Sequence, residues 1–252
     1  MSGAIVEDIR YDGGEGAPGE VEAYLVRPGS AAPGSCAGVL FWHWLDSEAP
    51  DGNRTQFRDE AAALAGRGVV SLLPQGRFPW TIAPTGSAAD RHEVEAEVAR
   101  LRTGLDLLAA RPEVDPERLA VVGHDYGAMH GIVEAASDPR VTALVVIAAT
   151  PRWSDWNVPF WGLEEGQLAY DRGMHDLDPI ERAVDLAGRP VLLQFAERDF
   201  FIAMMSGVRF RQAIGESAEL KGYDAAHDVR HPDARADRLA YLTSTLGLEE
   251  GG

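Results

Sequence analysis

The chain has 252 residues, 45% of them hydrophobic and 25% charged, and it carries a formal net charge of −17. This length and composition are typical of one large globular domain with a substantial core. The strong negative charge disfavours nucleic acid and anionic membrane surfaces as partners. We therefore expect a small-molecule substrate and no binding to nucleic acid or membrane. A homodimer is compatible with the sequence.

The cysteine count and the N-terminus bear on the compartment. Cys36 is the single cysteine, so no internal disulfide can form and a reducing environment fits. The stretch "MSGAIVEDIRYDGG" lacks the basic and apolar regions of a signal peptide. The apolar run at Val141–Ala149 is about half the ~18 residues of a membrane span. The sequence thus predicts a cytoplasmic protein.

The first two predicted strands form a hairpin. Residues 5–11 and 20–28 alternate apolar and polar side chains around the turn-rich stretch "DGGEGAPG". This alternation is typical of antiparallel strands with one face in water.

The rest of the chain alternates short apolar runs with helical patterns. The runs suit strands buried on both faces of a parallel sheet, and they are Ala37–His43, Gly68–Leu73, Leu119–His124, Val141–Ala149 and Pro190–Ala196. Apolar residues at three-and-four spacing predict helices within residues 54–68, 90–112, 208–217 and 233–247. We expect a single α/β domain over residues 1–252, with a mostly parallel sheet and helices on both faces. The long segment at about 150–188, which holds three of the six tryptophans, is expected to form a small cap over the carboxyl edge of the sheet.

The stretch "VVGHDYGAMHG", Val121 to Gly131, has the pattern Gly-x-nucleophile-x-Gly between a predicted strand and a predicted helix. Gly123 and Gly127 meet the demand for tiny residues two positions before and after the centre, where strand and helix nearly touch. The centre is Asp125. His124 is expected to pack or hydrogen-bond around this turn.

On the stretch "DLLAARPEVDPERLAVVGHDYGAMHG" the chain resembles an α/β-hydrolase, most of all the dienelactone hydrolase and acylaminoacyl-peptidase branch. The likeness runs from about Val39 to Leu246. That branch carries serine or cysteine at the position of Asp125. The aspartate in "GHDYG" is instead similar to the "GHDWG"-like turns of epoxide hydrolases and haloalkane dehalogenases, and this resemblance implies an aspartate nucleophile.

The resemblance also implies the partners of Asp125. In the family order of nucleophile, acid and histidine, the acid falls on Asp199 after the strand "PVLLQFA", and the histidine falls on His227. Asp199 also suits the N-cap of a helix starting at Phe200. The weaker candidates are Glu197 and Asp155 for the acid and His231 for the histidine.

Two backbone N–H groups are expected to form an oxyanion hole, those of Trp44 and Tyr126. Trp44 stands where the family usually has glycine. The substrate-binding candidates are His43, Trp153, Trp156, Trp161 and Tyr170. His43 also suits packing around the turn, and the aromatic residues also suit core or cap packing.

No metal or organic cofactor is expected. The spacing of His227 and His231 lacks the glutamate of a zinc-binding H-E-x-x-H helix and an evident third ligand. The arginine pair that fluoroacetate dehalogenases carry beside the nucleophile is absent from "DYGAM", which leaves Arg77 and Arg152 as anion-binding candidates.

The chemistry of a carboxylate nucleophile favours alkyl over acyl transfer. Attack on an ester carbonyl gives an anhydride, which is more reactive than the ester, whereas attack on an sp³ carbon gives an ordinary ester. Neither epoxide opening, which needs an acid such as Tyr170 and a second tyrosine, nor halide release has its complete equipment in the sequence. We expect a hydrolase of a small, mostly apolar molecule. The alternatives are a dienelactone hydrolase-like esterase, a non-hydrolytic enzyme and a binding protein.

Overall fold

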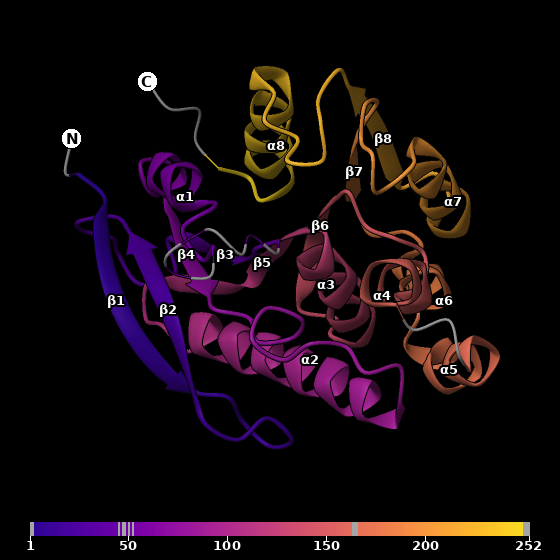
Figure 1. Cartoon of the computed structure of the whole chain (residues 1–252). Coiled ribbons are helices and arrows are strands. Elements are labelled where there is room, and N and C mark those ends of the chain that lie inside the picture. Colours follow the sequence, from indigo (N-terminus) through magenta and orange to yellow (C-terminus); the bar gives the residue numbers. More distant parts are fainter. Residues whose placement is uncertain are drawn as a thin grey trace.

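The computed structural model describes residues 3–44, 46, 49, 51, 53–162 and 166–248. In this part of the chain, eight strands form one sheet in the order β1-β2-β4-β3-β5-β6-β7-β8 (Figure 1). The strands are β1 (Ile5–Asp12), β2 (Glu20–Arg27), β3 (Cys36–Trp42), β4 (Val69–Pro74), β5 (Val114–His124), β6 (Val141–Ile147), β7 (Val191–Ala196) and β8 (Ala218–Tyr223). Strands β3 to β8 are parallel, and β1 and β2 extend the sheet as an antiparallel hairpin. The predicted hairpin and mostly parallel sheet are confirmed.

The helices cover both faces of the sheet, as predicted. On one face, α1 (Arg58–Ala65) and α8 (Pro232–Thr245) contact each other and the strands beneath them. On the other face lie α2 (Ala88–Ala109), α3 (Tyr126–Ser137) and α7 (Met204–Ile214), which pack on β3 to β8 (Figure 1). The central strands are buried along their whole length because helices cover them from both sides.

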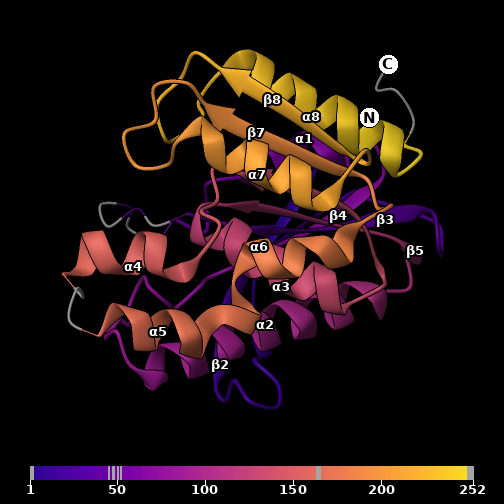
Figure 2. The same ribbon diagram turned by 90° about the vertical axis from the view of Figure 1, so that its right-hand side faces the viewer.

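The segment between β6 and β7 holds three more helices. These are α4 (Trp153–Trp161), α5 (Gln167–Met174) and α6 (Pro179–Ala183), and α6 packs between α3 and α7. Figure 2 shows α4 and α5 at the end of the sheet toward which β7 and β8 point. The role of this segment as a cap stays a prediction. No helix in the described residues is long and apolar enough to cross a membrane.

Candidate active site

Asp125 lies in a sharp turn between β5 and α3. Its backbone has φ 56° and ψ −122°, in the region that side-chain-bearing residues rarely adopt. The amide of Asp125 donates to the Ile147 carbonyl of the neighbouring strand at 2.8 Å. The turn therefore places the Asp125 side chain at the carboxyl edge of the sheet, where open α/β folds place their sites.

The two glycines around Asp125 allow this turn to close. A Cβ at Gly127 would lie 2.3 Å from the backbone oxygen of Trp42, and one at Gly123 would lie 2.5 Å from the Cα of Ala128. Both obstacles are backbone atoms, which cannot swing aside. The sequence-based reason for glycine at these two positions is confirmed.

His227 lies between two carboxylates. Its Nδ1 is 2.8 Å from Oδ2 of Asp199, and its Nε2 is 3.7 Å from Oδ2 of Asp125. The first distance is a hydrogen bond, and the second is an ion-pair distance too long for a hydrogen bond. Asp125 is 2% exposed and His227 6%. The structure thus brings together Asp125, His227 and Asp199, which lie far apart in the sequence.

A turn after β7 holds Asp199. Its Oδ1 accepts hydrogen bonds from the amides of Phe201 at 2.8 Å and Ile202 at 3.0 Å, which leaves Oδ2 for His227. The expected helix start at Phe200 is wrong, because α7 begins at Met204. The carboxylate caps a tight turn instead, and the same turn fixes its direction toward the imidazole.

Burial and the neighbouring charged groups shift the pKa values of both Asp125 and His227. Burial raises the pKa of Asp125, and the neighbouring His227 and Trp156 oppose that rise. Burial works against a charge on His227, but attraction to Asp125 and Asp199, together with the hydrogen bond to Asp199, outweighs it and raises the pKa to about 9. His227 is therefore an imidazolium at neutral pH as long as Asp125 is ionised.

Aromatic rings close the site. Trp156 lies edge-on to His227 with ring centroids 5.9 Å apart, and its buried indole N–H has no hydrogen-bond partner among the described residues. Phe201 also lies edge-on to His227, at 5.3 Å, and contacts Phe160 at 5.4 Å. Phe160 and Phe201 keep 43% and 45% of their surface in solvent. A continuous set of rings thus runs from the protein surface to the buried imidazole.

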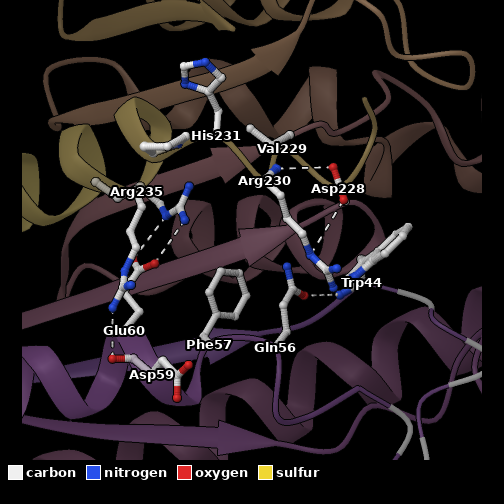
Figure 3. A pocket seen from close by; sticks show the side chains of 12 residues that line it. Trp44, Gln56, Phe57, Asp59, Glu60, Asp228, Val229, Arg230, His231 and Arg235 are labelled. Atoms are coloured by element: carbon white, nitrogen blue, oxygen red, sulfur yellow. Dashed lines mark hydrogen bonds and ion pairs between the residues drawn. The ribbon is translucent and has the colours of Figure 1, made fainter. Parts of the chain in front are cut away.

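The two expected oxyanion donors are in different situations. The N–H of Tyr126 is at the first position of α3, where an amide has no acceptor within the helix. The N–H of Trp44 already donates to Oε1 of Gln56 at 3.0 Å (Figure 3). In this structure the indole of Trp44 instead packs against His227, with ring centroids 5.1 Å apart. The oxyanion role of Trp44 stays a prediction that requires Gln56 to move.

Tyr126 and Tyr170 meet at one buried amide. The Tyr126 hydroxyl donates to Oδ1 of Asn157 at 2.7 Å, and Nδ2 of Asn157 donates to the Tyr170 hydroxyl at 2.6 Å. Trp161 Nε1 donates to the Tyr126 hydroxyl at 3.3 Å. Burial raises the pKa of both phenols. These bonds tie α4 and α5 to the first residue of α3, directly beside Asp125.

Two other substrate-binding candidates are engaged elsewhere. His43 Nε2 accepts from the Gly76 amide at 3.0 Å, and burial lowers the pKa of this histidine to about 4. The indole N–H of Trp153 donates to the Leu177 carbonyl at 2.7 Å. Their contact with a substrate stays a prediction.

The weaker candidates for the acid and the histidine lie outside the site. Asp155 pairs with Arg152 at 2.8 Å, and His231 caps the N-terminus of α8. Glu197 and the anion-binding candidate Arg77 are exposed. Among these carboxylates, Asp199 is the one that contacts the imidazole of His227.

Sequence reasoning missed several residues of the site. Phe160, Phe201, Asn157 and Gln56 carry no local motif, and they reach the site only through the three-dimensional fold. A weak signal existed for Asn157 and Phe160, since both lie in the tryptophan-rich segment expected to form the cap. No local signal pointed to Gln56.

No protein-family model matches the chain. No curated protein matches its sequence either. Solved structures do match. An acetyl xylan esterase from Paenibacillus sp. R4 superposes with a TM-score of 0.76 at 15% identity, over 97% of this chain and 85% of the esterase. A cold-adapted esterase from an Arctic intertidal metagenomic library gives 0.70 at 19% identity, over 97% and 95%.

A protein assigned as a dienelactone hydrolase from Klebsiella pneumoniae subsp. pneumoniae MGH 78578 has a TM-score of 0.68 at 20% identity, over 97% of this chain and 98% of that protein. The chain therefore has the fold of the α/β-hydrolases. At these identities the likeness establishes the fold and leaves the chemistry to the site.

Proposed function

We propose that the protein is a cofactor-independent hydrolase that uses Asp125 as a nucleophile on an sp³ carbon of a small, mostly apolar molecule. The observation that carries this proposal is the arrangement of His227 between Asp125 and Asp199, at 3.7 Å and 2.8 Å. A carboxylate at this position needs no base to become a nucleophile.

The first step forms an alkyl ester on Asp125. A carboxylate oxygen attacks the carbon, and the leaving atom departs with the bonding electron pair, as a halide or as an epoxide alkoxide that takes up a proton. Oδ1 of Asp125 has no hydrogen-bond partner among the described residues. Oδ1 is also buried, and a carboxylate oxygen without solvation is a stronger nucleophile than a solvated one.

Esterification of Asp125 changes the charge state of His227. Asp125 is one of the two carboxylates that raise the pKa of the imidazole, and its ester carries no charge. His227 then loses a proton more readily, to the alkoxide of an opened epoxide or to solvent after halide release. The neutral imidazole takes a proton from water, the hydroxide attacks the ester carbonyl, and Asp125 is regenerated as the alcohol leaves.

The surroundings of Asp125 support an apolar substrate. The rings of Trp156, Phe160 and Phe201 lie on the surface side of the buried carboxylate and imidazole. Apolar rings around a buried carboxylate limit its solvation by water, which increases its reactivity as a nucleophile.

The test is to trap the ester. In His227→Gln the attack of the carboxylate remains possible, with solvent supplying the proton to the alkoxide of an opened epoxide, but the water-activating base is gone. This variant is exposed to a panel of epoxides, haloalkanes and activated aryl esters, and the tryptic peptide Leu119–Arg140 is weighed. We expect an adduct on Asp125 with the mass of the intact epoxide, or of the haloalkane less its hydrogen halide. Turnover of a panel member by the wild type with no adduct on Asp125 in the variant would contradict the proposal.

The second candidate is an ester or lactone hydrolase, and the names of the structural neighbours favour it. In this case the wild type cleaves activated aryl esters, the activity is lost in His227→Gln, and no alkyl adduct forms on Asp125. If ligands quench tryptophan fluorescence and none is turned over, the chain is a binding protein.

A further inference from the structure

The side-chain amide of Gln56 connects two parts of the site. Its Nε2 lies 2.6 Å from Nδ1 of His124, and its Oε1 accepts from the Trp44 amide at 3.0 Å. Nε2 of His124 in turn lies 3.0 Å from the backbone oxygen of His227. Figure 3 shows Gln56 with its amide oxygen facing the backbone of Trp44, at the rim of a surface cavity of about 440 Å³.

Only one arrangement of hydrogens satisfies these contacts. A backbone carbonyl can only accept, so Nε2 of His124 carries the proton. Nδ1 of a neutral imidazole is then bare and accepts from the NH₂ group of Gln56. The remaining amide oxygen of Gln56 faces the Trp44 N–H, which can only donate. The three bonds therefore fix the tautomer of His124 and the orientation of the Gln56 amide together.

His124 remains neutral although it lies beside a cation. Burial lowers the pKa of His124 well below 6.5, and the charges of His227, Arg238 and Arg230 lower it further. The ring centroids of His124 and His227 are 5.5 Å apart. A second positive charge at this distance is disfavoured, so His124 stays neutral when His227 carries its proton.

The chain of bonds holds the catalytic base relative to the nucleophile. His124 directly precedes Asp125 at the end of β5. It hydrogen-bonds to the backbone oxygen of His227, whereas Asp199 hydrogen-bonds to the His227 ring. The indole of Trp44 stacks on His124 with centroids 5.4 Å apart and an interplanar angle of 16°. The bond from Gln56 to the Trp44 backbone keeps this indole in place.

We propose that Gln56 and His124 are positioning residues that hold the main chain of His227 at a fixed distance from Asp125. This inference rests on the proposed function for its kinetic consequence, but the hydrogen-bond chain itself can be measured without turnover.

The kinetic test compares two replacements of Gln56. Gln56→Leu removes both bonds. Gln56→Glu keeps an acceptor for the Trp44 N–H but places a carboxylate opposite the unprotonated Nδ1 of His124. Both groups are then acceptors, and a proton added to either one restores the bond. Loss of these hydrogen bonds is expected to reduce kcat about tenfold to a hundredfold at about pH 8, with less change in KM. Small displacements of catalytic groups lower the rate by about this factor. The exposed Gln212 provides a matched control, Gln212→Glu.

The pH dependence separates positioning from a purely structural role. The rate of Gln56→Glu relative to the wild type is expected to rise as the pH falls, whereas the relative rate of Gln56→Leu stays flat. If Gln56→Glu follows the wild type and Gln212→Glu at every pH, the inference is wrong.

Nitrogen-15 NMR of the histidine rings tests the chain of bonds directly. In the wild type, His124 is expected in the Nε2–H form and without titration between about pH 5 and 8. An Nδ1–H form, or ordinary titration near 6.5, would overturn the inference. Because these spectra require no substrate, a failure of the proposed function, seen as no adduct on Asp125, remains distinguishable from a failure of the inference.

Discussion

Replacing Asp125 with asparagine should lower the pKa of the His227 imidazole. Asparagine has nearly the shape of aspartate, and like the proposed ester it is uncharged. In the wild type the carboxylate lies 3.7 Å from Nε2, and both side chains are almost fully buried. At an effective dielectric constant of about 20, Coulomb's law gives about 4 kcal/mol for this pair. This energy corresponds to about three pH units.

The pKa of His227 should therefore fall from about 9 in the wild type to about 6 in Asp125→Asn. Nitrogen-15 NMR titration of the imidazole measures both values. Asp155→Asn removes a carboxylate from a surface ion pair with Arg152 and should leave His227 unchanged. If His227 titrates at the same pH in the wild type and in Asp125→Asn, the coupling is absent, and esterification cannot convert this imidazole into a base.

Three further predictions concern stability. Folding raises the pKa of His227 from 6.5 to about 9. The protonated imidazole therefore stabilises the folded state fully below about pH 6.5, and this stabilisation is lost as the pH rises through 9. Urea unfolding of the wild type should show a loss of about 3 kcal/mol by pH 10, and His227→Gln should not show this loss. Gly127→Ala should cost about 3 kcal/mol in the same assay, because its Cβ meets backbone, whereas Gly173→Ala, in open space within α5, should gain up to about 1 kcal/mol; equal effects would refute the close-packed turn. Asn157→Ala should cost about 1–3 kcal/mol, because it removes the acceptor of the Tyr126 hydroxyl and the donor to the Tyr170 hydroxyl. An unchanged midpoint would show that these bonds contribute nothing.

The parallel strands could be predicted because their local sequence determines them. Buried runs such as "AGVLFWH" and "PVLLQFA" are apolar at nearly every position, which is the pattern that a sheet covered on both faces requires. The boundaries were less predictable. Strand β5 begins at Val114, ahead of the apolar run, because Val114 pairs with Cys36 of β3, and the pairing continues at Leu119 after an irregularity in the register. Such pairing is set by a distant strand and leaves no trace in the local pattern.

The candidate site divides in the same way. The glycines two positions before and after Asp125 predict its place in the turn, and the order of elements predicts Asp199 and His227. The environment of these residues depends on segments that meet only in the fold. Gln56, in the turn before α1, reaches His124 at the end of β5. No periodicity or motif in the sequence encodes that contact.

The most direct test of the central claim, that Asp125 forms a covalent ester, is turnover in water enriched in oxygen-18. The wild type is allowed many turnovers of a panel substrate, and the peptide Leu119–Arg140 is fragmented to separate Asp125 from Glu134 and Asp138. If water attacks the ester carbonyl, oxygen-18 enters the carboxylate of Asp125 and no other side chain of the peptide. Oxygen-18 in the product with an unlabelled Asp125 would show that water attacks the substrate directly and would contradict the role of Asp125 as the nucleophile.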